Sequence, residues 1–322
     1  MIIVTNFVHF PSTWSAPGQK VGSAIYARTA AEFLAHQGPD TVWLVNCDPH
    51  LTLRLAFRKL LRSGGPKLVA VDLVLRRPKG FRDALPMSVK RFLLKRVDHF
   101  IHYFSDVRAY QETFGIDAAR SSFVPFKANL AESHTLQPEQ GSEQYILCFG
   151  RSMRDFDTFF DAVEQLPYPA AISRQDPAVL RTHGARFTRS WEQLPANLTV
   201  LDDDGGADAQ VRILENAKIV VLPILKTSMV ASGISSCLNA MSLGKCVIGT
   251  EGPGMSDVFQ EGEVLVVPPE EPAKLAAAIR SVWEDTELRR KTADAGFRYA
   301  KAAGGEQQLY QRILDRLASL AL

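Results

Sequence analysis

The chain has 322 residues, of which 46% are hydrophobic and 22% charged, and its formal net charge is +2. This composition is ordinary for a globular protein of two domains and excludes a disordered or fibrous chain. The first residues carry no basic segment, and no window approaches about 18 uninterrupted apolar residues, so neither a signal peptide nor a membrane span is expected. Four cysteines without a CxxC pair predict reduced, buried thiols, and a cytoplasmic location is therefore expected.

The first half of the chain alternates apolar strands with helices. Strands are predicted at residues 2–8, 41–46, 67–75, 99–105 and 122–126, and helices at 23–37, 51–62 and 86–96. The helix at 23–37 should end near Gly38-Pro39, which is a typical helix stop. Buried strands that alternate with helices indicate a parallel sheet with helices on both faces.

A polar segment at 131–143 separates this half from a second one with the same pattern, and it reads as a linker. Strands are predicted at 145–150, 170–174, 197–202, 218–224 and 245–250, and helices at 157–166, 234–243, 272–285 and 305–322. The sequence therefore predicts an α/β protein with two doubly wound, Rossmann-like domains, at 1–135 and 144–322. Ligands of such sheets lie at the carboxyl ends of the strands, and a cleft shared by the two domains is the default site.

Two strand-to-helix turns are candidates for binding phosphate. Gly22 follows the first strand, and a glycine at a helix start lets backbone N–H groups approach an anion, although a purely structural turn is the alternative. In the second half, Gly150 ends a strand and is followed by Arg151 and Arg154. Arginine forks suit a diphosphate, whereas the alternative is that these arginines pair with Asp155 or Asp157.

The segment from residue 220 to 259 is the richest in features. A buried strand ends at Pro223, and the following loop contains Lys226. A helix then opens near Ser232, Gly233, Ile234 and Ser235, where free N–H groups and the helix dipole favour an anion. The next strand ends at Glu251, before a glycine-rich turn that is expected to line the site.

The order of these features resembles the retaining glycosyltransferases of glycosyltransferase family 4, which have the GT-B fold. The resemblance rests on Leu222-Pro223, Gly233, Ala240-Met241, Gly244-Lys245 and Val247-Ile248, on the segment FGRSMRD, and on the glycine turn, acidic helix and Val-Pro-Pro strand that follow. It covers 145–285 well, 98–127 moderately and 1–97 only in outline. It implies two Rossmann-like domains that face a central cleft.

The sequence departs from that family at two positions. The family has two glutamates eight positions apart, and here the corresponding residues are Ala231 and Asn239. By resemblance, Asn239 would bind the ribose of the donor; the alternative is that it starts its helix or bonds a neighbouring loop. The lysine that usually follows the family's Gly-Arg segment is also missing, and Arg154 is the nearest basic residue.

Other candidates have weaker support. Asp72 ends a strand where the family often has a His-Asp pair near the donor sugar. His9, His99 and His102 are expected to be ordinary polar or core residues, and the acidic turn Asp202–Asp204 is expected to be solvated and not to hold a cation. No metal-ligand spacing, GxSxG motif or P-loop is present.

The resemblance implies transfer of a sugar from a UDP- or GDP-linked donor, with retention and without a metal. The acceptor is expected to be a glycan, a lipid-linked compound or a small molecule. The alternatives are an inactive GT-B binding protein, which the missing glutamates would explain, and an inverting GT-B enzyme with a base in its first domain.

The charge of the two halves suggests different partners. Residues 1–140 hold 18 Lys/Arg and 11 Asp/Glu, whereas the remainder holds 19 and 24. The basic residues interleave with apolar ones and suit either an anionic membrane or a solvated face, while nucleic acid is not expected because no recognition motif accompanies them. They are Arg54, Arg58, Lys59, Arg62, Arg76, Arg77, Lys79, Arg82, Lys90, Arg91, Lys95 and Arg96, with Phe81, Leu85, Phe92 and Leu93 between them.

Overall fold

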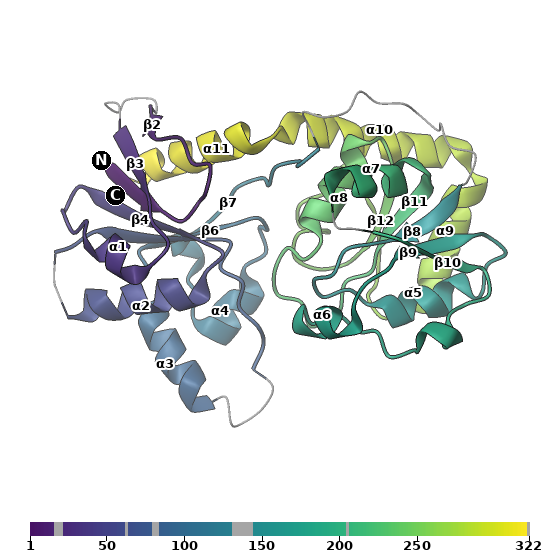
Figure 1. The fold of residues 1–322 in the computed structure, drawn as a ribbon, viewed down its shortest axis with the longest axis horizontal. Coiled ribbons are helices and arrows are strands. Elements are labelled where there is room, and N and C mark those ends of the chain that lie inside the picture. Colours follow the sequence, from purple (N-terminus) through teal and green to yellow (C-terminus); the bar gives the residue numbers. More distant parts are fainter. Residues whose placement is uncertain (16–21, 62–63, 79–83, 131–143, 204–205, 321–322) are drawn as a thin grey trace. The chain divides into compact units, whose positions relative to one another are not determined.

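The structure is a computed structural model that describes residues 1–15, 22–61, 64–78, 84–130, 144–203 and 206–320. Its contacts divide the chain into two compact units (Figure 1). Unit 1 is Met1–Pro125 with Gln307–Leu322, and unit 2 is Phe126–Glu306. The linker expected at 131–143 lies outside the described residues, as do Arg62, Lys79, Phe81, Arg82 and Asp204.

Unit 1 is built on a seven-stranded sheet in the order β2-β3-β1-β4-β5-β6-β7, in which only β2 is antiparallel to its neighbour. Its strands are β1 (Ile2–Thr5), β2 (Thr13–Trp14), β3 (Gly22–Tyr26), β4 (Thr41–Asn46), β5 (Lys67–Val71), β6 (His99–His102) and β7 (Ser121–Phe123). Its helices are α1 (Ala30–Leu34), α2 (Pro49–Leu60), α3 (Ala84–Leu94), α4 (Arg108–Phe114) and, apart from its first residue, α11 (Glu306–Ser319).

The helix expected at 23–37 is the main error in the predicted elements. Residues 23–26 form β3, which pairs in parallel with β1 and antiparallel with Thr13–Trp14. The helix begins only after Thr29, whose side chain accepts a hydrogen bond from Glu32 N–H while Glu32 reaches back to the backbone N–H of Thr29. Because this capping box fixes a helix start, the pattern Thr-Ala-Ala-Glu marked the boundary that the apolar spacing obscured.

Unit 2 is a six-stranded parallel sheet in the order β10-β9-β8-β11-β12-β13. Its strands are β8 (Tyr145–Cys148), β9 (Ala170–Ser173), β10 (Leu198–Leu201), β11 (Ala217–Leu222), β12 (Cys246–Thr250) and β13 (Leu265–Val267). Its helices are α5 (Phe156–Val163), α6 (Pro177–Thr182), α7 (Ala207–Glu215), α8 (Ile234–Ser242), α9 (Pro272–Glu284) and α10 (Thr286–Ala303). Helices α6, α7 and α10 were not predicted.

Alternate side chains of these strands enter two separate cores. Ile146 and Cys148 of β8 pack with α5 and α9, whereas Tyr145 and Leu147 pack with α7 and α8 on the opposite face. Because successive side chains of a strand point to opposite faces, a fully buried strand such as YILC requires helices on both faces. The predicted fold class, two parallel-sheet α/β domains, is confirmed.

The last helix returns to unit 1. Leu309, Ile313, Leu314 and Leu317 of α11 are buried, and the ring of Tyr310 lies 5.4 Å from that of Phe7. Within the part of the chain that the structure describes, no helix combines the length and the apolarity that crossing a membrane requires.

Candidate functional site

The strand order of unit 2 identifies where a ligand should bind. Numbered within the unit, the strands run 3-2-1-4-5-6, and the direction of the connections reverses between β8 and β11. Open parallel sheets bind ligands outside the carboxyl ends of the strands at this switch point. Gly150 follows β8 there, and Pro223 and Ile224 follow β11.

The loops that leave β8 and β11 are joined by backbone hydrogen bonds. Asp155 N–H donates to the carbonyl of Pro223 at 2.9 Å, and Leu225 N–H donates to that of Met153 at 2.9 Å. Arg154 and Ile224 form an isolated antiparallel bridge between these bonds. These hydrogen bonds hold the two loops together at the switch point.

The side chain of Arg154 lies between two glycines of this region. Gly150 and Gly233 both have positive φ, +91° and +90°. A Cβ on Gly150 would lie 2.5 Å from Nη2 of Arg154, and one on Gly233 would lie 2.8 Å from Nη1. Both positions therefore require glycine for two reasons, the backbone conformation and the space that the guanidinium occupies.

Arg154 is a buried cation. Its side chain is 1% exposed and donates from Nε to the Phe149 carbonyl at 2.8 Å and from Nη1 to the Ser152 carbonyl at 3.2 Å. Burial lowers its pKa to about 10, so the guanidinium stays charged at neutral pH. It pairs with no carboxylate among the described residues, and a charge in this state attracts an anion.

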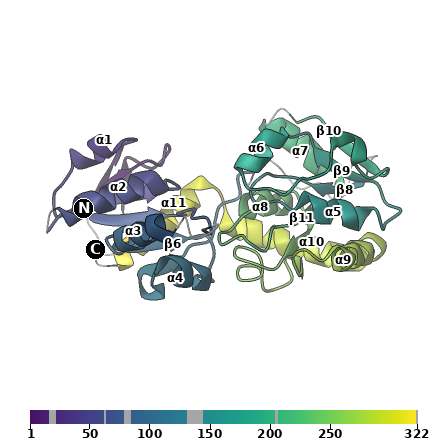
Figure 2. The same cartoon turned by 90° about the horizontal axis from the view of Figure 1, so that it is seen from below.

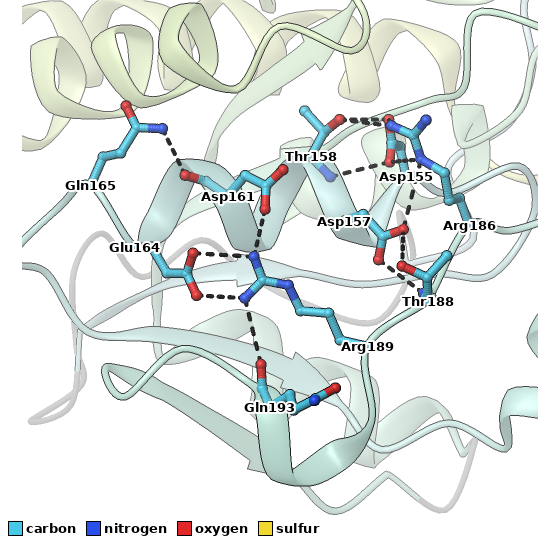
Figure 3. A network of polar contacts seen from close by, with 10 residues as sticks. All are labelled: Asp155, Asp157, Thr158, Asp161, Glu164, Gln165, Arg186, Thr188, Arg189 and Gln193. Atoms are coloured by element: carbon cyan, nitrogen blue, oxygen red, sulfur yellow. Dashed lines mark hydrogen bonds and ion pairs between the residues drawn. The ribbon is translucent and has the colours of Figure 1, made fainter.

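The acidic residues that follow Arg154 in the sequence form hydrogen bonds and ion pairs with other side chains (Figure 3). Both oxygens of the buried Asp155 carboxylate accept from Arg186, at 2.8 and 2.6 Å, and the same carboxylate caps α5 by accepting from Thr158. Asp157 accepts from the backbone and hydroxyl of Thr188, both at 2.9 Å. The alternative that Arg151 or Arg154 pairs with Asp155 or Asp157 is therefore wrong.

Helix α8 begins directly beside Arg154. Gly233 is its N-cap, as the sequence predicted, and the buried hydroxyl of Ser232 lies 3.0 Å from that of Ser228. Ile234 N–H donates to the Ala231 carbonyl at 3.3 Å, and the hydroxyl of Ser235 accepts from the Asn129 side chain at 2.7 Å. The start of a helix carries the positive end of its dipole, so it adds to the field of Arg154.

Asn239 bonds a neighbouring loop. Its Oδ1 accepts from the backbone N–H of Asn129 at 3.2 Å, and the residue is 5% exposed. The amide Nδ2 donates to no group within the described residues. This contact is the structural alternative that the sequence left open, and it leaves the Nδ2 donors and the second lone pair of Oδ1 for a ribose hydroxyl.

Three further candidates lie at the surface. Arg151, Lys226 and Glu251 are exposed, and their side chains make no polar contact with any described residue. Beside Glu251, the glycine turn lies against Ala231: a Cβ on Gly254 would be 2.5 Å from Cα of Ala231. The missing side chain of Gly254 therefore makes room for this close approach of the two backbones.

Gly22 does not start a helix. It opens β3, and a Cβ there would lie 2.3 Å from the indole of Trp14. The missing side chain accommodates Trp14, which is 5% exposed. Gly22 thus has the structural role that was the alternative to phosphate binding. Nothing in the sequence around Trp14 indicated its contact with Gly22.

Unit 1 has its own group of polar side chains at the carboxyl edge. Cys47 follows β4 and Asp72 follows β5, and both have positive φ, +50° and +45°. The thiol of Cys47 donates to the Asp72 carboxylate at 3.2 Å. Non-glycine residues at positive φ cost about 1–2 kcal/mol each, and such strain gathers at functional sites.

Burial perturbs the titration of this group. It raises the pKa of Asp72, a shift that the hydrogen bond from Cys47 partly opposes. Cys47 itself is exposed, so the prediction of a buried thiol is wrong there, whereas Cys148, Cys237 and Cys246 are buried. Tyr103, the first residue after β6, has a pKa raised first by burial and then by the charge of Asp72. His102 is neutral, because burial lowers its pKa to about 3, and His99 is held at about 4 in the same way.

Cys47 and Arg186, whose side chains bond to Asp72 and Asp155, were not predicted from the sequence. Cys47 carried no signal beyond its place after a buried strand, the same signal that singled out Asp72. Arg186 lies in a segment without periodicity. Within the described ranges, no three His, Cys, Asp or Glu side chains gather in a way that could hold a metal ion.

Solved structures share this fold. A sucrose-phosphate synthase of Thermosynechococcus elongatus is 15% identical, with a TM-score of 0.67 over 100% of this chain and 88% of that one. A glycosyltransferase of Rickettsia africae is 13% identical, with a TM-score of 0.66 over 93% and 85%. HepE of Anabaena in complex with UDP-glucose is 13% identical, with a TM-score of 0.66 over 99% of each chain. The fold is GT-B.

One family model also matches the chain. Residues 190–299 match the model described as Glycosyl transferases group 1. This part of the GT-B chain contains Lys226, Gly233 and Asn239, but it leaves out Gly150, Arg154 and all of unit 1. A search of the curated proteins finds no significant sequence match. The matched domain and the GT-B fold together support a glycosyltransferase.

Proposed function

We propose that the chain transfers a glycosyl group from a nucleoside diphosphate sugar, UDP- or GDP-linked, and that unit 2 binds the donor diphosphate between the carboxyl ends of β8 and β11. The observation that carries this proposal is Arg154, a buried cation without a carboxylate partner among the described residues, beside the N-terminus of α8. Structures with the same fold have been solved with UDP and with UDP-glucose, which supports a nucleotide sugar as the donor.

The chemistry of the transfer requires positive charge where the diphosphate leaves. Breaking the bond between the anomeric carbon and the phosphate oxygen leaves additional negative charge on the diphosphate. In this proposal, the buried Arg154 and the first turn of α8 supply a fixed positive electrostatic field. The exposed Arg151 and Lys226 contact the phosphate oxygens directly. A site of this kind needs no metal, because the cations are supplied by the chain.

We propose retention at the anomeric carbon, in line with the resemblance to family 4, and an acceptor that is a glycan, a lipid-linked compound or a small molecule. Asp72 is the carboxylate that we propose for a catalytic role from unit 1. One observation favours a second candidate, a binding protein without turnover: neither Ala231 nor Asn239 carries a carboxylate, and Asn239 is bonded to Asn129.

Calorimetry with UDP and GDP on Arg154→Met tests the diphosphate site. Removing the buried positive charge beside the diphosphate should weaken nucleotide binding by about 1.5–3 kcal/mol, which is a factor of roughly 10 to 150. Arg298→Met, an exposed arginine of α10, is the matched control and should leave the affinity unchanged. A folded Arg154→Met protein that binds both nucleotides as tightly as the parent would overturn the proposed site.

Turnover needs a separate measurement. Slow hydrolysis of the bound donor in the absence of acceptor is expected of an enzyme, whereas a binding protein leaves the donor intact. NMR of the released or transferred sugar then reports the anomeric configuration, and an inverted product would exclude the retaining reaction.

A further inference from the structure

Helices α2 and α3 expose large apolar side chains on their outer faces. Phe57 is 51% exposed and Leu61 63%, while Leu51 and Leu55 form the buried side of α2. On α3, Val89 is 52% and Phe92 51% exposed. Apolar groups three or four residues apart lie on the same side of a helix, so each helix presents a pair of apolar side chains to solvent.

Cations accompany both apolar pairs. Arg54 and Arg58 are exposed at helical spacing from Phe57 and Leu61, and neither α2 nor α3 contains an Asp or Glu. Lys95 and Arg96 are exposed directly after α3, and the guanidinium of Arg96 lies 5.8 Å from the ring centre of Phe92. Lys59, in contrast, is paired with Asp98 and does not contribute a free charge.

The two helices pack against one another at one end of unit 1 (Figures 1 and 2). Together they place exposed apolar groups and exposed cations on neighbouring helices of the same unit. We name the exposed residues Arg54, Phe57, Arg58, Leu61, Val89, Phe92, Lys95 and Arg96 the basic-apolar surface.

We propose that the basic-apolar surface docks the chain on an anionic lipid bilayer. An interfacial helix has apolar side chains that enter the acyl boundary and cations that meet the lipid phosphates, and both kinds of group are present. A second copy of the chain is a poor occupant, because it would bring like charges together. Nucleic acid would pair with the cations but would leave the four apolar side chains without a partner. The proposal is independent of the donor site in unit 2.

Co-sedimentation of the full chain with vesicles tests the proposal. Phosphatidylglycerol vesicles at low salt are expected to carry the protein down, and phosphatidylcholine vesicles are not. Arg54→Gln combined with Arg58→Gln should lower the partition roughly 25-fold, because each cation near such a surface contributes about 1 kcal/mol. Phe57→Ser combined with Leu61→Ser should also lower it, and at high salt this pair should keep its effect while the charge pair loses it.

Two substitutions outside the surface serve as controls. Val8→Ser removes an apolar side chain that is 67% exposed in another part of unit 1, and Arg298→Gln removes an exposed cation from unit 2. Neither should change the partition. Equal binding to both lipids, no binding to phosphatidylglycerol at low salt, or losses equal to those of the controls would each overturn the proposal. So would a chain that binds RNA but no vesicle.

Discussion

At the carboxyl edges of the two sheets, residues of different types adopt positive φ. In each unit the backbone turns sharply as it leaves a central strand, with positive φ. Unit 2 has Gly150 after β8 and Gly233 at the start of α8, and the space that their missing side chains leave is filled by the guanidinium of Arg154. Unit 1 uses Cys47 and Asp72, whose side chains bond to each other.

This difference sets the electrostatics of the two edges. Burial lowers the pKa of Arg154 only to about 10, well above neutral pH, so the edge of unit 2 holds a buried cation. At the edge of unit 1, burial raises the pKa of Asp72 and Tyr103 and lowers that of His102, so the neutral form of each group is favoured. The comparison teaches that turns made of glycine leave space for a buried charged side chain. Turns made of ionisable residues instead place those residues where their neutral forms are favoured.

The largest effect is expected for Gly233→Ala. The new Cβ would meet Nη1 of Arg154 at 2.8 Å in a buried place, in addition to the cost of positive φ. We expect the free energy of unfolding of unit 2 to fall by about 2–4 kcal/mol, measured by urea titration. Gly262→Ala is the matched control, because Gly262 has φ +86° and no neighbour within 4 Å, and it should cost only about 1 kcal/mol. Equal losses would mean that Arg154 does not fill the space.

His102→Phe should stabilise unit 1. Neither ring nitrogen of His102 has a hydrogen-bond partner among the described residues, although the ring packs against Phe104 and Tyr110. Removing two buried unsatisfied nitrogens should raise the free energy of unfolding by about 1–2 kcal/mol at pH 7.

The pH dependence of stability checks the reason for this gain. The pKa of His102 is lowered by burial to about 3, so the unfolded chain binds its proton first and the parent loses stability as pH falls from about 6.5 toward 3. The variant should lose less over this range, as followed by thermal unfolding. His183→Phe, at an exposed histidine, should show neither effect.

Asp72→Asn should separate stability from activity. Because burial raises the pKa of Asp72, its charged form destabilises the folded state, and this cost grows as pH rises above the unfolded value near 4. The variant should be more stable than the parent at pH 7 by about 1 kcal/mol, and the advantage should disappear toward pH 4. Transfer activity should be lost if Asp72 acts in catalysis. Asp40→Asn, on the surface of the same unit, should change neither quantity.

The smallest effect is expected for Asn239→Glu. A carboxylate there can keep the bond from Asn129 N–H and offer a ribose hydroxyl a charged acceptor, whereas Asn239 offers only the neutral second lone pair of Oδ1. The affinity for nucleotide should rise by about 0.5–1.5 kcal/mol in calorimetry. Gln210→Glu on α7 adds the same charge elsewhere in unit 2, and an equal gain from it would contradict a specific role for position 239.

The sequence predicted the sheets well, because runs such as YILC and VWLV are apolar throughout, as is typical of strands that are covered on both faces. It also located Gly150 and Gly233 at strand-to-helix turns. It did not predict which way Arg154 points, since a flexible side chain beside two glycines can turn outward or inward and only the neighbouring loop decides. The strand at Gly22 was missed for a similar reason: its apolar spacing also fits a helix, and pairing with β1 overrides that pattern.

The path of the chain has a consequence for synthesis. Unit 1 is assembled from the beginning of the chain and from Gln307–Leu322, with the whole of unit 2 encoded in between. On the ribosome, the first 125 residues emerge long before the helix that covers Phe7, so the apolar side chains that α11 buries stay uncovered while unit 2 is made and folded. Unit 1 can therefore become native only after Gln307–Leu322 has left the ribosome.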